Sequence, residues 1–151
     1  MSIEKIVLDT NGLLQMLNRK SPYHHILQKI VKGEISLCIS NEIIMEYSEV
    51  ITNHTNKSVA DTVIAFILNN PATIRVDDYV RWNIVTTDPD DNKFVDCAIW
   101  ANARFLVSDD KHLRILKKKV PPLVDLKTLQ EYHEYLTAKQ LSGIRGRKRK
   151  K

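Results

Sequence analysis

Short apolar runs separated by helix-like stretches are the feature that most constrains the fold of this chain. Three of these runs, Ile6-Val7-Leu8, Ile35–Ile39 and Phe105-Leu106-Val107, have the length and the branched or aromatic side chains of buried strands. The stretches between them carry apolar residues at helical spacing. Strands that alternate with helices predict an α/β fold with a mainly parallel sheet covered on both faces.

Residues that start and stop helices locate the remaining elements. Ser21-Pro22 is a good helix start, Gly33 is a helix end, and Ser40 caps a helix that carries Tyr47 and Ile51 on its apolar face. Further helices are predicted at residues 11–19, 21–32, 58–68, 92–104, 111–119 and 126–136, and further short strands at residues 73–76, 82–85 and 123–124.

The chain has 151 residues, which is long enough for one domain with its own core. No apolar run approaches the roughly 18 residues of a membrane span, and the polar start lacks the apolar stretch of a secretory signal. We therefore expect a cytoplasmic protein that does not enter a membrane. Cys38 and Cys97 lie in apolar surroundings and are predicted to be buried free thiols.

The excess positive charge of the chain is concentrated at its end. Residues 139–151 hold seven basic residues and no acidic one, whereas the whole chain has a net charge of +5, so the rest of the chain is slightly acidic. This segment has too little apolar content to fold by itself. We predict a folded domain over residues 1–137 and a disordered basic tail over residues 138–151. The tail is equally consistent with solvation alone and with binding of nucleic-acid phosphates.

Two acidic residues follow predicted strands directly. Asp9 comes after Ile6-Val7-Leu8, and Asp110 comes shortly after Phe105-Leu106-Val107. In open α/β sheets, ligands bind in the crevice outside the carboxyl ends of the strands. Asp9 and Asp110 are therefore expected to meet in that crevice.

Two further acids lie on predicted helices. Glu46 shares a helix face with Glu42, because the two residues are four positions apart. Asp96 is surrounded by apolar residues, where a carboxylate without a partner is costly to bury. Three of these acids taken singly have another explanation, since Asp9 and Asp110 are also suited to capping helices and Glu46 to a solvated surface. Asp96 is harder to dismiss, because its flanks are apolar.

A cluster of these carboxylates would require a cation. Two carboxylates about 4 Å apart repel by about 4 kcal/mol at an effective dielectric constant of 20, whereas a whole domain is stable by only about 5–15 kcal/mol. Hard oxygen ligands favour Mg²⁺ or Mn²⁺. Such an ion lowers the pKa of a bound water and neutralises charge on a phosphate, which indicates phosphodiester hydrolysis.

Several other enzyme classes lack their motifs in this sequence. There is no Gly-rich phosphate loop, no serine in a nucleophile elbow and no HExxH pair for zinc. Asn11 stands where a haloacid-dehalogenase-type phosphatase has its second aspartate.

Four ordered motifs resemble the PIN-domain family. They are Val7-Leu8-Asp9-Thr10-Asn11, Ser40-x-Glu42-Ile43-x-x-Glu46, Asp88-x-Asp90-Asp91-Asn92-Lys93-Phe94-x-Asp96-x-Ala98 and Leu106-Val107-Ser108-x-Asp110-Lys111-x-Leu113. The likeness covers about residues 3 to 127 and is greatest to the virulence-associated protein C-like toxin ribonucleases of bacterial toxin–antitoxin pairs. It implies a three-layer, Rossmann-like α/β/α domain that cuts single-stranded RNA with Mg²⁺ or Mn²⁺. It also implies possible dimers and inhibition by a small antitoxin.

The resemblance also implies roles for individual residues. Asp9, Glu46, Asp96 and Asp110 are the expected catalytic acids, and Asp9, Asp96 and Asp110 are the expected metal ligands. Asn11 and Ser108 are expected to orient carboxylates or water. Asp91 is a secondary candidate, because it precedes Asp96 by five residues, about 140° around a helix, and is equally suited to capping that helix. Many family members have a small residue at the position of Asp109, and alignment to the strand end favours Asp110 as the site residue.

Basic residues are candidates for nucleic-acid contacts, although a solvated surface is the more common use of such side chains. These candidates are Lys93, Lys111, Arg145, Arg147 and Lys148.

The leading hypothesis is a metal-dependent endoribonuclease, identified by its ordered acids. The alternative is a catalytically silent RNA-binding module that depends on the basic tail. A receiver-like signalling domain is a third possibility, and Glu46 and Asp96 argue against it.

Overall fold

The computed structural model describes residues 3–77, 92–113 and 124–149. The strand predicted at residues 82–85 and the secondary candidate Asp91 lie outside these ranges. So do residues 114–119 of the predicted helix that starts at residue 111.

In the described part of the chain, five parallel strands form the central sheet, in the order β3-β2-β1-β4-β5. The strands are β1 Glu4–Leu8, β2 Ile35–Ile39, β3 Ile74–Arg75, β4 Phe105–Val107 and β5 Leu126–Lys127. β1 lies at the centre, where Ile6 is in register with Leu37 of β2 on one side and with Phe105 of β4 on the other. The predicted parallel sheet is confirmed.

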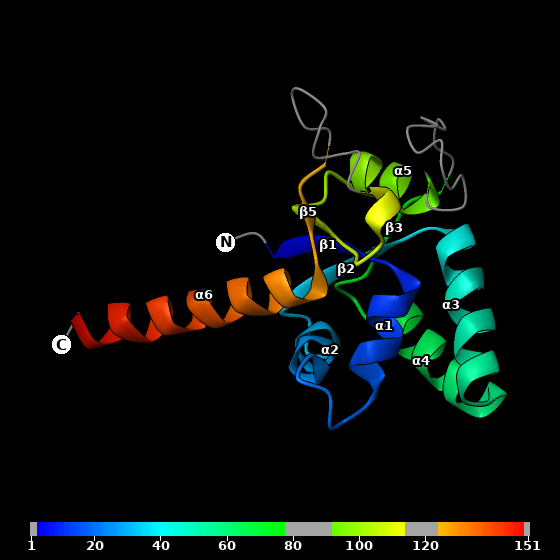
Figure 1. Ribbon diagram of the computed structural model, residues 1–151, viewed down its shortest axis with the longest axis horizontal. Coiled ribbons are helices and arrows are strands. Elements are labelled where there is room, and N and C mark those ends of the chain that lie inside the picture. Colours follow the sequence, from blue (N-terminus) through cyan, green and yellow to red (C-terminus); the bar gives the residue numbers. More distant parts are fainter. Residues whose placement is uncertain (1–2, 78–91, 114–123, 150–151) are drawn as a thin grey trace.

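Helices cover both faces of the sheet (Figure 1). They are α1 Thr10–Leu17, α2 His24–Val31, α3 Asn41–His54, α4 Lys57–Asn69, α5 Asn92–Ala101 and α6 Leu129–Arg149. α5 contacts β1, β2 and β4 from one side, whereas α2 and the start of α6 lie on the other side of the sheet. α3 and α4 pack against each other. The arrangement has the three layers that the family resemblance implies.

The strand order creates a switch point between β1 and β4. The chain proceeds from β1 to β2 and β3 in one direction, and then returns to the opposite side of β1 to form β4. The connections that leave the carboxyl ends of β1 and β4 therefore diverge. Such a divergence leaves the crevice in which α/β proteins bind ligands.

Side-chain caps fix three of the helices where the sequence has Asp, Ser or Asn. Asp9 caps α1, Ser40 caps α3 by accepting a hydrogen bond from the Ile43 amide, and Asn56 caps α4. Gly33 ends the α2 region with a φ of 77°, a left-handed conformation that glycine adopts without steric cost.

Predicted boundaries were wrong at α2, at α6 and at β5. Ser21 does not cap α2, because residues 18–24 form a turn in which the Ser21 carbonyl accepts from the His24 amide, and the helix begins only at His24. The last helix begins at Leu129 instead of residue 126, and the strand predicted at residues 123–124 is found at Leu126–Lys127, because Leu126 pairs with Leu106 at the sheet edge.

The start of α6 is a capping box. The Thr128 hydroxyl accepts from the Glu131 amide, and the Glu131 carboxylate accepts from the Thr128 amide. α6 then continues to Arg149 through the segment for which the sequence predicts disorder, and Figure 1 shows its end projecting from the body. The division into residues 1–137 and 138–151 stays a prediction. Within the described ranges, no helix is long and apolar enough to cross a membrane.

Two of the described glycines, Gly33 after α2 and Gly143 within α6, provide a matched test of this backbone. Gly33→Ala places a side chain at positive φ, so we expect it to lower the free energy of unfolding by roughly 1–2 kcal/mol. Gly143→Ala adds a methyl group to α6 where no atom beyond the chain neighbours and the backbone of the helix itself lies within 4 Å, so we expect a gain of roughly 0.5–1 kcal/mol. Urea denaturation of both variants measures the difference, and equal effects at the two positions would contradict the assignment.

Candidate functional site

Asp9 joins three elements at the carboxyl end of the sheet. It follows β1 directly, and its Oδ1 accepts a hydrogen bond of 2.8 Å from the Gly12 amide in the first turn of α1. Its Oδ2 accepts a hydrogen bond of 2.6 Å from the Ser108 hydroxyl, which follows β4. The carboxylate is thus fixed across the switch point between β1 and β4.

The surroundings of Asp9 favour its neutral form. Burial is the largest influence and raises the pKa of the carboxyl above its ordinary value of 3.8, while the hydrogen bonds from Ser108 and Gly12 lower it. The charges of Asp109 and Asp110 raise this pKa further. Asp9 therefore lies within the field of both aspartates that follow β4.

Gly12 allows this close packing. A Cβ atom at this position would lie 2.8 Å from Leu8 Cδ1 and 3.0 Å from Asp9 Oδ1. A larger residue would therefore displace the carboxylate or the strand end. The capping of α1 and the position of Asp9 both depend on this glycine.

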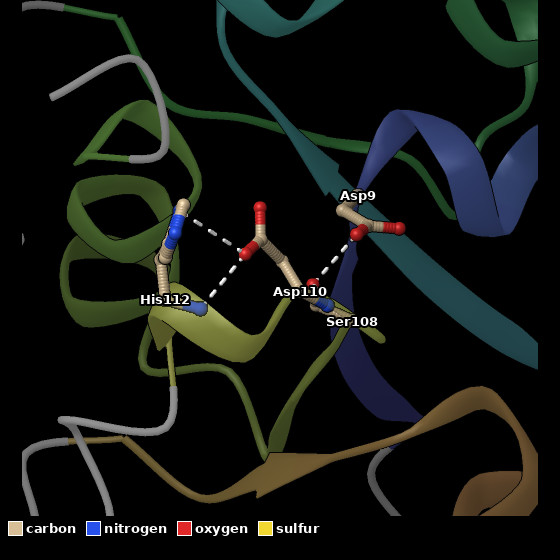
Figure 2. A network of polar contacts seen from close by, with 4 residues as sticks. All are labelled: Asp9, Ser108, Asp110 and His112. Atoms are coloured by element: carbon tan, nitrogen blue, oxygen red, sulfur yellow. Dashed lines mark hydrogen bonds and ion pairs between the residues drawn. The ribbon is translucent and has the colours of Figure 1, made fainter. Parts of the chain in front are cut away.

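Asp110 lies next to Asp9 in the same polar network (Figure 2). Its amide donates to Ser108 Oγ at 3.0 Å, so the Ser108 side chain lies between the two aspartates. Its own Oδ1 accepts from the His112 amide at 2.8 Å and lies 3.6 Å from His112 Nδ1. Ser108 therefore links Asp9 and Asp110, the two strand-end acids that were predicted to meet, by hydrogen-bonding to both residues.

Asp109 holds helices together. Its Oδ1 accepts a hydrogen bond of 2.9 Å from the Leu129 amide at the start of α6, and its Oδ2 accepts one of 3.4 Å from Gln15 of α1. Both oxygens thus have protein donors. This structural use agrees with the choice of Asp110 as the site residue, which stays a prediction.

A pocket of about 400 Å³ opens at this edge of the sheet. Its lining consists of Asp9, Asn11, Leu14, Gln15, Asp109 and Asp110. Of the predicted site residues, Asp9, Asn11 and Asp110 are therefore gathered in one cavity. Glu46 and Asp96 do not appear among the described residues that line it.

Glu46 is held beside the pocket by two donors. Thr10, which follows Asp9, donates a hydrogen bond from its hydroxyl to Glu46 Oε2, and Lys93 Nζ lies 2.9 Å from Glu46 Oε1. Lys93 was a candidate for contacts with nucleic acid, and here it forms an ion pair with one of the predicted catalytic acids. Asp96 is buried within α5, as its apolar flanks predict.

The donor set fits a divalent cation of the Mg²⁺ or Mn²⁺ type. Asp9 and Asp110 supply carboxylate oxygens to the pocket and Asn11 supplies an amide. Mg²⁺ commonly uses one or two carboxylates and completes its shell with water and substrate phosphate. Within the described residues, no group of three or more His, Cys, Asp or Glu side chains is already placed to hold a metal.

The remaining predicted candidates are basic residues proposed to contact nucleic acid. Lys111 is exposed just after Asp110, and Arg145, Arg147 and Lys148 belong to the last turns of α6. The roles of Thr10, Gly12 and Asp109 were not predicted from the sequence. Thr10 lies within the first motif of the family resemblance, and this was the only signal that pointed to it.

Comparisons with known proteins agree with this architecture. A family model described as PIN domain matches residues 5–112. The structure of VapBC2 from Rickettsia felis bound to a DNA fragment from their promoter shares the fold, with a TM-score of 0.57, 17% identity and coverage of 82% of this chain and 98% of that chain. The structure of FitAB bound to an IR36 DNA fragment has a TM-score of 0.53 and 11% identity, and covers 82% of this chain and 94% of that chain. No curated protein matches the chain.

The raised pKa of Asp9 predicts a pH-dependent cost to stability. Below its ordinary pKa of 3.8 the carboxyl is protonated in the folded and unfolded states, and as the pH rises through the higher folded pKa the buried group must ionise. Asp9→Asn keeps an acceptor for Gly12 and removes the charge, so we expect it to raise the melting temperature at pH 7 and to have little effect near pH 4.

Thermal unfolding between pH 4 and pH 8 measures this difference. Asp61→Asn is the control, because Asp61 is exposed on α4. A gain from Asp9→Asn that is equal at both ends of the pH range would show that ionisation of Asp9 is not its cause.

Proposed function

This chain belongs to the PIN-domain family, and from that premise we propose that it is a metal-dependent endoribonuclease that hydrolyses single-stranded RNA. PIN domains are generally nucleases, and they typically use divalent metal ions. The observation that carries the proposal is the Asp9–Ser108–Asp110 network beside the pocket at the switch point.

In this proposal Asp9, Asp96 and Asp110 hold Mg²⁺ or Mn²⁺, and Glu46 completes the catalytic acids. The bound ion would supply a water of lowered pKa and would neutralise charge on the scissile phosphate. Ser108 keeps Asp9 oriented, and Asn11 offers a polar group to water or substrate from the pocket wall. Asp91 remains a secondary candidate.

Burial of Asp9 couples this site to pH. A carboxylate must lose its proton before it binds a cation, and burial raises the pKa of Asp9. We therefore expect metal affinity to increase as the pH rises through that pKa. The hydrogen bonds from Gly12 and Ser108 favour the charged form and oppose the effect of burial.

The wider surroundings suggest how substrate and partners are bound. We assign RNA phosphates to Lys93, Lys111 and the basic residues Arg145, Arg147 and Lys148 of the tail that follows a nuclease domain over residues 1–137. Two of the structural neighbours are VapBC2 and FitAB, each bound to a DNA fragment. We propose that this chain is the toxin of a toxin–antitoxin pair, acts in the cytoplasm, and binds a small antitoxin and a second copy of itself.

Removal of the strand-end carboxylates tests the activity. Asp9→Asn and Asp110→Asn are each expected to lower the cleavage of single-stranded RNA at least about 100-fold in Mn²⁺, because metal-ion stabilisation of the transition state amounts to several kcal/mol. Gel analysis of a labelled RNA measures the rates, and Asp61→Asn should cleave like the unaltered protein.

The same experiment separates the two hypotheses from the sequence. Full activity in the Asp9→Asn and Asp110→Asn variants would overturn the site. RNA binding without cleavage, lost on deletion of residues 143–151 and unaffected by Mn²⁺, would establish the RNA-binding module instead.

Stabilisation by metal tests the site without relying on activity. Mn²⁺ at 100 times its dissociation constant should stabilise the folded protein by about 2.7 kcal/mol. We therefore expect Mn²⁺ to raise the melting temperature of the unaltered protein but not that of Asp110→Asn. An equal increase in both proteins would place the cation elsewhere.

A further inference from the structure

Lys93 and Glu46 form an ion pair between two helices beside the proposed site. Lys93 lies in the first turn of α5 and Glu46 lies in α3, and these helices contact each other. Their charged atoms are 2.9 Å apart, and the side chain of Lys93 is only 12% exposed. The ammonium also lies 5.2 Å from the centre of the Phe94 ring. A shielded pair of this kind is screened less by salt than a surface pair.

Thr10 gives the second oxygen of Glu46 a donor. Because Thr10 follows Asp9 directly, Glu46 is tied to the same strand end as the pocket. Burial raises the pKa of the Tyr47 hydroxyl, and the charges of Asp9 and Glu46 contribute to this increase. The charges of Asp9 and Glu46 therefore both act on the Tyr47 hydroxyl. The two carboxylates differ in their partners, because Glu46 pairs with the Lys93 ammonium whereas Asp9 accepts hydrogen bonds from the uncharged Gly12 and Ser108.

The pocket has a different charge balance from Glu46. Its described lining includes the carboxylates of Asp9, Asp109 and Asp110 and contains no basic residue. The pocket thus concentrates negative charge, whereas Glu46 already has a cation in contact. Electrostatic repulsion creates a need for a metal ion at the pocket but not at Glu46.

We propose that Lys93 takes the place of a second metal ion, so that the site binds one divalent cation at the pocket while the Lys93 ammonium compensates Glu46. This inference rests on the proposed function, because it assumes that the pocket binds a metal. Lys93 is then a positioning residue that holds Glu46 and limits the number of metal ions.

Mn²⁺ binding to the full chain, measured by isothermal titration calorimetry, tests the stoichiometry. We expect one Mn²⁺ per chain for the unaltered protein. Lys93→Met leaves Glu46 without its counter-charge, so we expect a second Mn²⁺ to bind, or the first to bind at least about tenfold more tightly. Lys93→Arg keeps the charge and should retain the original stoichiometry and affinity.

Lys29→Met is the matched control, because Lys29 of α2 pairs at 3.5 Å with Glu34, which lies beyond the end of that helix. Circular dichroism establishes that each variant is folded, and added Mn²⁺ should restore any stability that Lys93→Met loses. One Mn²⁺ bound with unchanged affinity by folded Lys93→Met would overturn this inference alone, as would two Mn²⁺ bound by the unaltered protein. Failure of all four proteins to bind Mn²⁺ would also overturn the metal dependence of the proposed function.

Discussion

The buried carboxylate of Asp9 is the interaction on which the geometry of the site depends. One oxygen holds the first turn of α1 through Gly12, and the other holds the segment after β4 through Ser108. Because β1 and β4 are parallel neighbours, their carboxyl ends lie side by side at the switch point. The same hydrogen bonds that link α1 and the segment after β4 to the end of β1 therefore also hold an acidic group at the pocket.

This arrangement carries an electrostatic cost that the fold offsets only in part. Burial and two neighbouring aspartates raise the pKa of Asp9, while Gly12 and Ser108 stabilise its charged form. A buried acid beside other acids is typical of sites in which function, not stability, sets the residue type. A bound cation would relieve the repulsion, so the instability of the site and its proposed use have the same physical origin.

The acids near the pocket serve different purposes, because each has different hydrogen-bond or ion-pair partners. Asp109 accepts from Leu129 and Gln15, and so joins the loop after β4 to α6 and α1. Glu46 is held by Lys93 and Thr10. Asp110 turns one oxygen to the His112 amide and lines the pocket. Equal charge at neighbouring positions therefore does not imply equal function, because the donors around each carboxylate decide what it can bind.

The sequence by itself determined the features that local patterns encode. Apolar runs gave β1, β2 and β4, and Asp9 and Ser40 gave their helix caps, because strand length, helical spacing and capping depend on residues close together in the chain. The parallel sheet and the placement of Asp9 and Asp110 after strands followed from the same patterns. The turn at Ser21 was missed, because its serine and proline suit a turn as well as a helix start.

Only the tertiary structure decided the strand order and the partners of Glu46 and Asp109, whereas the start of α6 at Leu129 is encoded locally by the capping box of Thr128 and Glu131, which the prediction missed. Leu126 joins the sheet because Leu106 is beside it, and Lys93 reaches Glu46 because α5 packs against α3. These contacts link residues that are tens of positions apart. Their energies come from packing and desolvation in the assembled fold, and no local pattern in the sequence records them.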